Sequence, residues 1–223
     1  GKSVGSFGDI SAWSFCNDKI MTTGGEGGMV TTNSKKLYDF VSSFNNHGKN
    51  LKKYFALKNP KSFPYIHDNL GSNYRLTELQ SAIGIYQIKQ MKKWHSARKR
   101  NANAYIRAIS GLRLFNVPSI KKDYEHAWYK LYLTLNSQNM KRSWSLNKII
   151  KKLNDKGVSC SFGGCGEMYK EKAFSLNKSH SVLVNANFLE NNSLMLLIHP
   201  TITSNEILRR SKILKQIIID ASI

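Results

Sequence analysis

The sequence predicts an α/β protein made of two domains. Short segments rich in aromatic and branched apolar residues alternate with longer segments whose apolar residues recur at helical spacing. The longest helical segment is followed by Gly111 and Pro118, two residues that end helices and mark a boundary. The chain has 223 residues, enough to bury a core in each of two small domains. We therefore expect one domain over residues 1–112 and a second over residues 113–223.

The first domain is predicted to contain two strands, two helices and one long loop. In order, these are strands over 10–15 and 28–32, a helix over 34–44, a loop over 45–74 and a helix over 77–107. Asn33 or Ser34 is the expected N-cap of the first helix. Thr77 and Gln80 have the capping-box spacing at the head of the long helix. The polar and aromatic loop is longer than a connector needs to be, so it is expected to be functional or disordered.

The second domain is predicted to be a smaller α/β unit. Its expected elements are strands over 128–135, 158–162 and 193–198 and helices over 144–154 and 203–219. The first strand alternates apolar and polar residues, and the first helix is amphipathic and ends at Gly157. Thr203 and Glu206 form a second capping-box pattern, which starts the last helix.

The segment from Ser14 to Met29 carries the chemistry that the sequence suggests. Lys19 lies between a short apolar strand and a run of four glycines interrupted only by Glu26. Lysine can form a Schiff base with an aldehyde cofactor or a ketone substrate. Because its ordinary pKa is about 10.4, such a lysine needs a shaped or partly desolvated site. Ser14 offers a hydroxyl for a phosphate oxygen, and the glycines allow close backbone approach to a ligand or positive φ.

The same glycine run does not fit a nucleotide-binding P-loop. No Gly-Lys-Ser or Gly-Lys-Thr closes the run between Thr22 and Gly28. Lys19 also precedes the glycines, whereas the P-loop lysine follows them.

The cysteine content and the apolar runs restrict the class of protein. Cys16, Cys160 and Cys165 make a sparse, odd-numbered set, which is typical of reduced thiols and predicts a cytoplasmic location. The spacing of the last two does not fit a zinc knuckle, so no metal site is predicted. The longest aliphatic run, Leu194–Ile198, is too short for a membrane span.

The net charge of +20 suggests nucleic acid as an alternative partner. The basic residues, however, are scattered in short groups along the chain, and no nucleic-acid-binding motif accompanies them. Nucleic-acid binding therefore remains the alternative hypothesis and is not the favoured one.

The Lys19 segment resembles the active-site segment of the DegT/DnrJ/EryC1/StrS family, the nucleotide-sugar aminotransferases that depend on pyridoxal 5′-phosphate (PLP). In that family, Ser-Phe precedes the PLP lysine and Thr-Thr-Gly-Glu-Gly-Gly follows it. This chain keeps that order with one extra glycine, and Asn17-Asp18 precede the lysine. Further landmarks of the family recur in the family's order at His47-Gly48, Gly71–Gln80, His126–Tyr129 and Leu197–Pro200.

The resemblance implies the type I fold of PLP-dependent transferases. Residues 1–112 would be the back part of the large, mostly parallel-sheet domain, and residues 113–223 a small C-terminal α/β domain. The implied reaction moves an amino group from glutamate onto a keto nucleotide sugar, for polysaccharide or antibiotic sugar synthesis. Dehydratases of the family have histidine in place of the lysine, so Lys19 favours transamination.

The resemblance also implies roles for individual residues. Lys19 would hold PLP covalently and move a proton as general acid and base, and Ser14 would bind the PLP phosphate. Asn73 would reach the phosphate of the PLP in a partner subunit, which implies a homodimer with a shared active site. His199 and Arg75 are the candidates for the nucleotide-sugar diphosphate.

The family comparison further implies that this chain is incomplete. In the family, a segment before the equivalent of Gly1 contains an aspartate that contacts the pyridine nitrogen of PLP. About the first half of the enzyme would then be absent, and the 223-residue chain alone is expected to be inactive and either poorly soluble or loosely folded. The alternative to the aminotransferase is thus a basic nucleic-acid-binding protein or an inactive fragment of such an enzyme.

Overall fold

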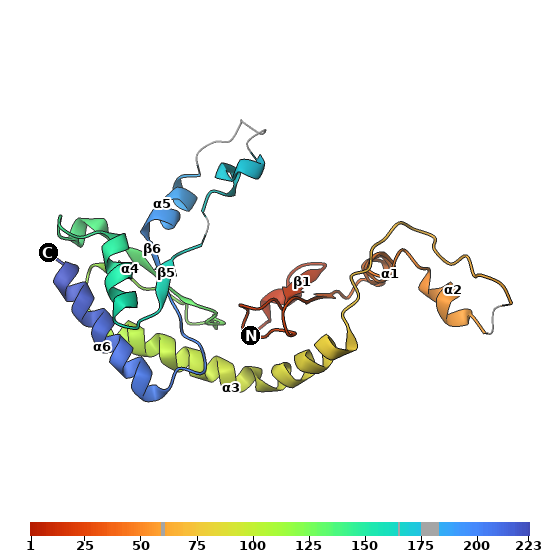
Figure 1. Cartoon of the computed structure of the whole chain (residues 1–223), viewed down its shortest axis with the longest axis horizontal. Coiled ribbons are helices and arrows are strands. Elements are labelled where there is room, and N and C mark those ends of the chain that lie inside the picture. Colours follow the sequence, from red (N-terminus) through yellow and green to blue (C-terminus); the bar gives the residue numbers. More distant parts are fainter. Residues whose placement is uncertain (59–60, 165, 175–182) are drawn as a thin grey trace. The chain divides into compact units, whose positions relative to one another are not determined.

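The computed structural model describes residues 1–58, 61–164, 166–174 and 183–223 (Figure 1). The chain divides into two compact units, Gly1–Met91 and Lys92–Ile223. The division falls within the longest helix, α3 (Glu78–Ala108). The division into domains at residue 112 stays a prediction. None of the helices in the described ranges is long and apolar enough to cross a membrane.

The first unit contains a strand pair and helices. Its elements are β1 (Ser11–Ser14), β2 (Gly28–Thr31), α1 (Lys35–Phe44), α2 (Leu51–Ala56) and the first part of α3. The two strands pair antiparallel, with Ser14 opposite Gly28. Most residues of both strands are exposed. Helix α2 lies inside the segment that the sequence predicted to be a loop.

Side-chain caps explain where the helices of this unit begin. The Ser34 hydroxyl accepts from the Leu37 N–H at 3.4 Å at the start of α1. At α3, Thr77 Oγ1 accepts from the Gln80 N–H at 3.2 Å, and Gln80 Oε1 accepts from the Thr77 N–H at 3.1 Å. These two reciprocal bonds form the predicted capping box. The start of α2 is capped by Asn50, whose side chain accepts from the Lys53 N–H.

The second unit is built around a four-stranded antiparallel sheet in the order β3-β4-β6-β5. Its elements are β3 (Phe115–Asn116), β4 (Leu131–Leu135), α4 (Leu146–Asp155), β5 (Cys160–Phe162), α5 (Val184–Asn192), β6 (Ser193–Leu196) and α6 (Ser204–Ala221). Single 3-10 turns of helix cover Val4–Ser6 in the first unit and Ser137–Asn139, Met168–Lys170 and Lys172–Phe174 in the second. Strand β3 and helix α5 were not predicted from the sequence.

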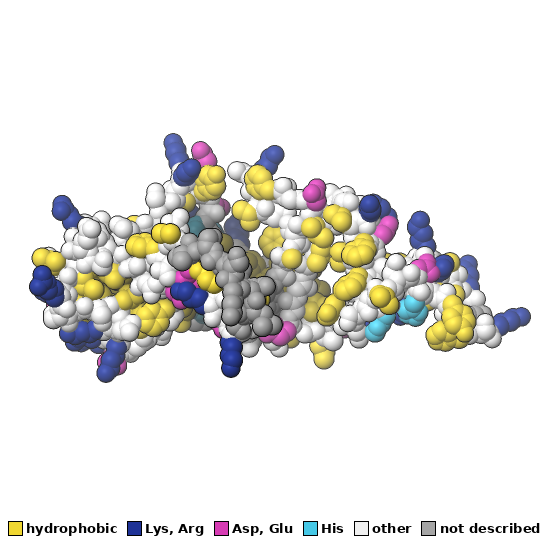
Figure 2. Space-filling view, turned by 90° about the horizontal axis from the view of Figure 1, so that it is seen from above, with side chains coloured by type: hydrophobic (Ala, Val, Ile, Leu, Met, Phe, Trp, Pro, Cys, Tyr) yellow, Lys and Arg dark blue, Asp and Glu magenta, His cyan; other side chains and the backbone are white. Residues whose placement is uncertain are grey.

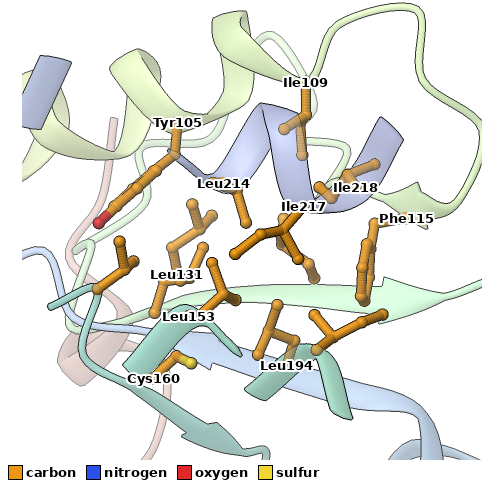
Figure 3. Close-up of a cluster of buried hydrophobic side chains, with 14 of the residues drawn as sticks. Tyr105, Ile109, Phe115, Leu131, Leu153, Cys160, Leu194, Leu214, Ile217 and Ile218 are labelled. Carbon is orange, nitrogen blue, oxygen red and sulfur yellow. The ribbon is translucent and has the colours of Figure 1, made fainter. Parts of the chain in front are cut away.

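One face of this sheet and three helices enclose the hydrophobic core of the second unit (Figure 3). In β4, Leu131, Leu133 and Leu135 are buried and the residues between them are not, as period-two alternation requires. Helix α4 contributes Leu153, helix α6 contributes Leu214, Ile217 and Ile218, and the second half of α3 contributes Tyr105 and Ile109. The core therefore holds strands β4 and β6, next to which the His126–Tyr129 and Leu197–Pro200 landmarks lie.

Every strand pair in the described residues is antiparallel. The mostly parallel sheet that the resemblance implied for the large domain is thus not formed by these residues.

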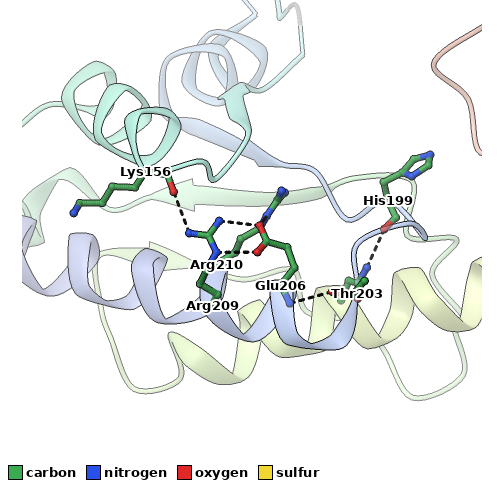
Figure 4. Close-up of polar contacts among 7 residues, drawn as sticks. Lys156, His199, Thr203, Glu206, Arg209 and Arg210 are labelled. Carbon is green, nitrogen blue, oxygen red and sulfur yellow. Dashed lines mark hydrogen bonds and ion pairs between the residues drawn. The ribbon is translucent and has the colours of Figure 1, made fainter.

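The start of α6 combines a helix cap with an ion-pair cluster (Figure 4). Thr203 Oγ1 accepts from the Glu206 N–H at 3.2 Å, as the sequence predicted. The Glu206 carboxylate does not complete the capping box. It accepts from both Arg209 and Arg210, at 2.6–2.8 Å, and Arg209 also donates to the Lys156 carbonyl at 3.3 Å. The cluster therefore joins α6 to the end of α4.

This cluster predicts a pH-dependent contribution to stability. Hydrogen bonds from Arg209 and Arg210 lower the pKa of Glu206 from 4.5 to about 2. A carboxylate whose pKa falls on folding stabilises the fold above its unfolded pKa, and that stabilisation is lost as the pH falls. Glu206→Gln is expected to lower the thermal midpoint at pH 7, and its difference from the unmodified protein should shrink between about pH 4.5 and 2.

The matched control is Asp155→Asn, at an exposed carboxylate that makes no ion pair within the described ranges. Thermal unfolding of the three proteins at pH 7 and at pH 3 checks the prediction. A Glu206→Gln difference that is equal at both pH values would contradict it.

Candidate functional site

The strand pair β1–β2 closes a loop that carries Lys19. Beyond the strand ends, the Phe15 N–H donates to the Gly27 carbonyl at 2.8 Å, and the Thr23 N–H donates to the Phe15 carbonyl at 3.1 Å. These two bonds narrow the base of the loop and fix its entry and exit. Lys19 therefore lies on a short loop anchored to a regular strand pair.

The backbone turns sharply just before the lysine side chain. The Lys19 N–H donates to the Cys16 carbonyl at 3.1 Å. Lys19 Nζ lies 3.4 Å from Asp18 Oδ1, and the Cys16 thiol donates to the same carboxylate oxygen at 3.3 Å. The Lys19 side chain is 39% exposed, so its amine is accessible beside a carboxylate.

Ser14, the second predicted cofactor residue, ends β1 at the base of the same loop. Its side chain is exposed, and its Oγ accepts a long hydrogen bond of 3.4 Å from the Cys16 N–H. The structure thus places the hydroxyl of Ser14 and the amine of Lys19 on one short segment.

The glycine run shapes this loop. Gly24 and Gly25 have φ of 82° and 141°, backbone angles that residues other than glycine rarely adopt. A Cβ at Gly27 would lie 2.1 Å from Thr23 Oγ1, so this glycine makes room for a buried threonine. The sequence suggested two uses for the glycines, close approach to a ligand and positive φ. The structure shows positive φ at Gly24 and Gly25, and Gly27 serves packing within the loop itself.

Asn73 and Arg75 lie on a segment held against the end of α1. Asn73 faces Asn46 in an isolated antiparallel bridge. On either side of it, the His47 N–H donates to Ser72 at 3.1 Å and the Tyr74 N–H donates to Asn45 at 3.0 Å. Arg75 Nη1 donates to Asn46 Oδ1. Asn73 and Arg75 are both exposed, so the segment presents them on the surface of the first unit.

The His47-Gly48 landmark has a structural role in holding that segment. Both residues have positive φ, 60° and 79°. A Cβ at Gly48 would lie 1.7 Å from the Asn69 carbonyl oxygen, and one at Gly71 would lie 2.3 Å from the Gly48 nitrogen. The two chain segments can therefore approach this closely only with glycine at both positions.

His199 belongs to the second unit, whereas the other four predicted site residues belong to the first. Its carbonyl accepts from the Ile202 N–H at 3.1 Å (Figure 4) and from Asn101 Nδ2 at 3.0 Å. Its ring Nδ1 lies 2.8 Å from Thr201 Oγ1. Burial, and then the nearby charge of Arg98, lower the pKa of the His199 ring. The residue is therefore a neutral hydrogen-bonding group at pH 7.

The His126–Tyr129 landmark is a packing feature of the same unit. His126 Nδ1 accepts from the Trp128 N–H at 2.8 Å, which supports the positive φ of 54° at Trp128. The buried Arg98 donates from Nη1 to the Tyr129 carbonyl at 2.7 Å. These contacts fix the chain as it enters β4.

Two glutamines of α3 contact the Lys19 loop, and the sequence analysis assigned neither contact. Gln80 Nε2 donates to the Glu26 carbonyl at 2.7 Å, and Gln87 Oε1 accepts from the Thr22 N–H at 2.8 Å. The sequence indicated Gln80 only as a capping residue. The one signal that could have found the pair is their spacing of seven, which places both on one helix face.

Metal and nucleic-acid sites have little support in the structure. Cys165 lies outside the described residues, while Cys16 and Cys160 are free thiols. Burial raises the pKa of the Cys160 thiol to about 12. Among the described residues, no three His, Cys, Asp or Glu side chains are grouped to hold a metal ion. On the face shown in Figure 2, Lys and Arg side chains are dispersed among hydrophobic and uncharged ones.

Comparison with known proteins gives matches over nearly all of the chain. Residues 1–214 match the DegT/DnrJ/EryC1/StrS aminotransferase family. The GDP-perosamine synthase of Escherichia coli O157:H7 is 39% identical over 129 residues, which are 58% of this chain and 32% of that enzyme. The chain spans between 27% and 56% of the length of the curated relatives that it matches.

Solved structures confirm the predicted fold class. An aminotransferase from Psychrobacter cryohalolentis is 38% identical, with a TM-score of 0.93 over 99% of this chain and 58% of that one. The E. coli GDP-4-keto-6-deoxy-D-mannose-3-dehydratase, solved with bound hydrated PLP, matches 97% of this chain and 56% of its own, with a TM-score of 0.77 and 20% identity. This last likeness shows the fold alone. The chain belongs to the DegT/DnrJ/EryC1/StrS aminotransferase family, whose cofactor is PLP.

Proposed function

We propose that the protein containing this chain moves an amino group from glutamate onto a keto nucleotide sugar, in the synthesis of polysaccharide or antibiotic sugars. The observation that carries the proposal is Lys19, a lysine on the strand-anchored loop of a chain that matches the aminotransferase family from residue 1 to 214. The similarity to a GDP-perosamine synthase supports a nucleotide sugar as the substrate class.

The residues of the loop fit PLP, which carries an aldehyde and a phosphate-bearing methylene on neighbouring carbons of its ring. Lys19 offers a primary amine that is 39% exposed. The exposed Ser14 hydroxyl donates no hydrogen bond within the part of the chain that the structure describes, so its O–H is available to a phosphate oxygen. The loop thus offers one amine for the aldehyde and one hydroxyl for the phosphate on a single short segment.

Different residues of the chain would then bind the cofactor and transfer the proton. When bound, PLP supplies an electron sink for the reacting carbon. Lys19 holds the cofactor and, once released, its neutral Nζ takes and returns the proton that moves during amino transfer. Ser14 binds the phosphate, and the exposed Asn73 amide binds the phosphate of the cofactor in a second copy of the chain.

Arg75 and His199 are proposed to bind the diphosphate of the sugar nucleotide in different ways. Arg75 supplies the positive charge, and its contact with Asn46 orients the guanidinium. His199 acts as a neutral donor, because burial and Arg98 disfavour its protonated form. Its Nδ1 is engaged with Thr201, which leaves Nε2–H for an oxygen of the substrate.

We also propose that the protein is a cytoplasmic homodimer with a shared active site, because Asn73 serves the cofactor of its partner. Light scattering during size-exclusion chromatography tests the dimer. If the protein is a monomer at the concentrations that support activity, the shared site is wrong.

The reaction itself is tested by incubating the protein with PLP, glutamate and nucleotide-linked 3-keto or 4-keto sugars. Mass spectrometry is expected to show a glutamate-dependent amino sugar. A deoxy sugar formed without amino-group transfer would indicate a dehydratase instead. Salt-sensitive duplex binding by a protein that takes up no PLP would favour the nucleic-acid alternative.

A further inference from the structure

One face of α3 contacts the Lys19 loop, through Ile83 beside Gly24 and through three residues in a row. Gln80, Gly84 and Gln87 follow one another at spacings of four and three, which places them in a row on the same side of the helix. All three lie in the first unit, as does the loop. We call these three residues the α3 row.

The two glutamines hold the loop with opposite hydrogen-bond polarity. Gln87 is an acceptor, since its Oε1 receives the Thr22 N–H at 2.8 Å. Gln80 is a donor, since its Nε2 gives a hydrogen to the Glu26 carbonyl at 2.7 Å. The Gln80 amide cannot turn over, because its Oε1 is already held by the Thr77 N–H and hydroxyl in the capping box.

Gly84 lies between the glutamines and leaves space for Thr23. The Thr23 side chain is only 1% exposed, and its hydroxyl donates to the Glu26 carbonyl at 3.2 Å. A Cβ at Gly84 would lie 3.1 Å from Thr23 Cγ2, closer than an ordinary contact. The α3 row therefore contacts the loop at Thr22, Thr23 and Glu26, three to seven residues after Lys19.

We propose that the α3 row positions Lys19, and that Gln80 and Gln87 are positioning residues for the reaction. The backbone after Lys19 is fixed to α3 at two points. The backbone before it is held by the Lys19–Cys16 bond within the loop and by the Phe15–Gly27 bond at the base of the loop. The lysine is thus held from both sides. This inference rests on the proposed role of Lys19 as the residue that holds PLP.

The polarity of the two contacts makes the inference testable with single-atom changes. Gln87→Glu keeps an acceptor for the Thr22 N–H, whereas Gln80→Glu replaces a donor with a carboxylate oxygen that faces a carbonyl. Hydrogen exchange measured by mass spectrometry, without PLP, is expected to speed up about tenfold in the peptide over residues 20–27 in Gln80→Glu and Gln87→Ala. Gln87→Glu is expected to exchange like the unmodified protein.

The control is Gln90→Ala, on the same helix, since no hydrogen bond of the Gln90 side chain occurs in the described ranges. Equal exchange in all variants would overturn the inference. Faster exchange in both glutamate variants alike would also overturn it, because it would show that polarity is irrelevant.

A second readout separates this inference from the proposed function. This readout has two parts, the fraction of Lys19 that PLP modifies and the pH at which the bound chromophore titrates. Both are expected to change in Gln80→Glu and in Gln87→Ala. In Gln87→Glu both are expected to return to the values of the unmodified protein. If PLP never modifies Lys19 in the unmodified protein, the proposed function fails whatever the exchange data show. If PLP modifies Lys19 equally in all variants with one titration midpoint, the positioning role fails while the proposed function stands.

A rescue experiment tests the third contact and guards against simple misfolding. Gly84→Ala is expected to accelerate exchange of the same peptide, because its new methyl group presses on Thr23 Cγ2. Thr23→Ser removes that methyl group and keeps the hydroxyl, so the double variant is expected to return to the exchange rate of Thr23→Ser alone. Failure of the rescue would show that the α3 row does not act through this contact.

Discussion

Replacing Lys19 with alanine is expected to abolish the attachment of PLP that borohydride can reduce to a stable adduct on this chain. The loop offers its primary amine 39% exposed on a segment fixed by the β1–β2 pair. The substitution also removes the group proposed to carry the proton, and loss of a general acid or base alone lowers rates by about 10²–10⁴. Peptide mapping after reduction measures the attachment, and amino-sugar formation in the protein that contains this chain measures the rate.

Two further variants make this result specific. Lys19→Arg keeps the positive charge next to Asp18 but has no amine that can form a Schiff base, so it is expected to behave like the alanine variant. Lys35→Ala removes an exposed lysine of α1 and is expected to leave attachment unchanged. Attachment that persists in Lys19→Ala, at the same stoichiometry and at another lysine, would show that the site has been placed wrongly.

Local signals in the sequence located most helices and strands well. Caps were the most reliable of them, because a side chain and the N–H that it binds lie three residues apart. Ser34 and the Thr77–Gln80 box start α1 and α3 as predicted. Positive φ at Gly111 and Gly157 explains why helices α3 and α4 end near these residues.

Features set by distant contacts could not be predicted in the same way. Helix α2 has only six residues, too few to show a helical period, and its Asn50 cap lies in a stretch that reads as polar loop. The bond between Gln87 and Thr22 joins residues 65 positions apart. Strand direction is also a tertiary property, so the antiparallel pairing of β1 with β2 had no local signal.

The candidate site shows the same limit. Lys19 and Ser14 could be proposed as site residues from the sequence alone because they lie on one continuous motif, and their roles stay a prediction. The glycines of the landmarks were recognised, but whether each serves a ligand or the chain's own packing depends on neighbours far away in the sequence. Gly48 is an example, since the atom that requires a glycine there is the carbonyl oxygen of Asn69.

Gly48→Ala is therefore expected to be among the most damaging single changes in the first unit. Its φ of 79° would cost an alanine about 1–2 kcal/mol in backbone strain alone. Its new Cβ would also lie 1.7 Å from the Asn69 carbonyl oxygen, a backbone atom that cannot rotate away. The segment from Asn69 to Tyr74 must then move off the end of α1, and the bonds from His47 to Ser72 and from Tyr74 to Asn45 break with it.

Gly111→Ala provides the matched control, because Gly111 has a nearly equal φ of 82° and a Cβ there would meet no atom within 4 Å among the described residues. It is expected to show the strain cost alone, whereas Gly48→Ala should also release protection from hydrogen exchange at His47 and Tyr74. Asn73, which we propose to bind the PLP phosphate, lies between the released bonds. If that proposal holds, Gly48→Ala should weaken PLP binding as much as Asn73→Ala does. Equal losses of stability in the two glycine variants, with exchange at His47 unchanged, would show that the close approach to Asn69 does not hold this segment in place.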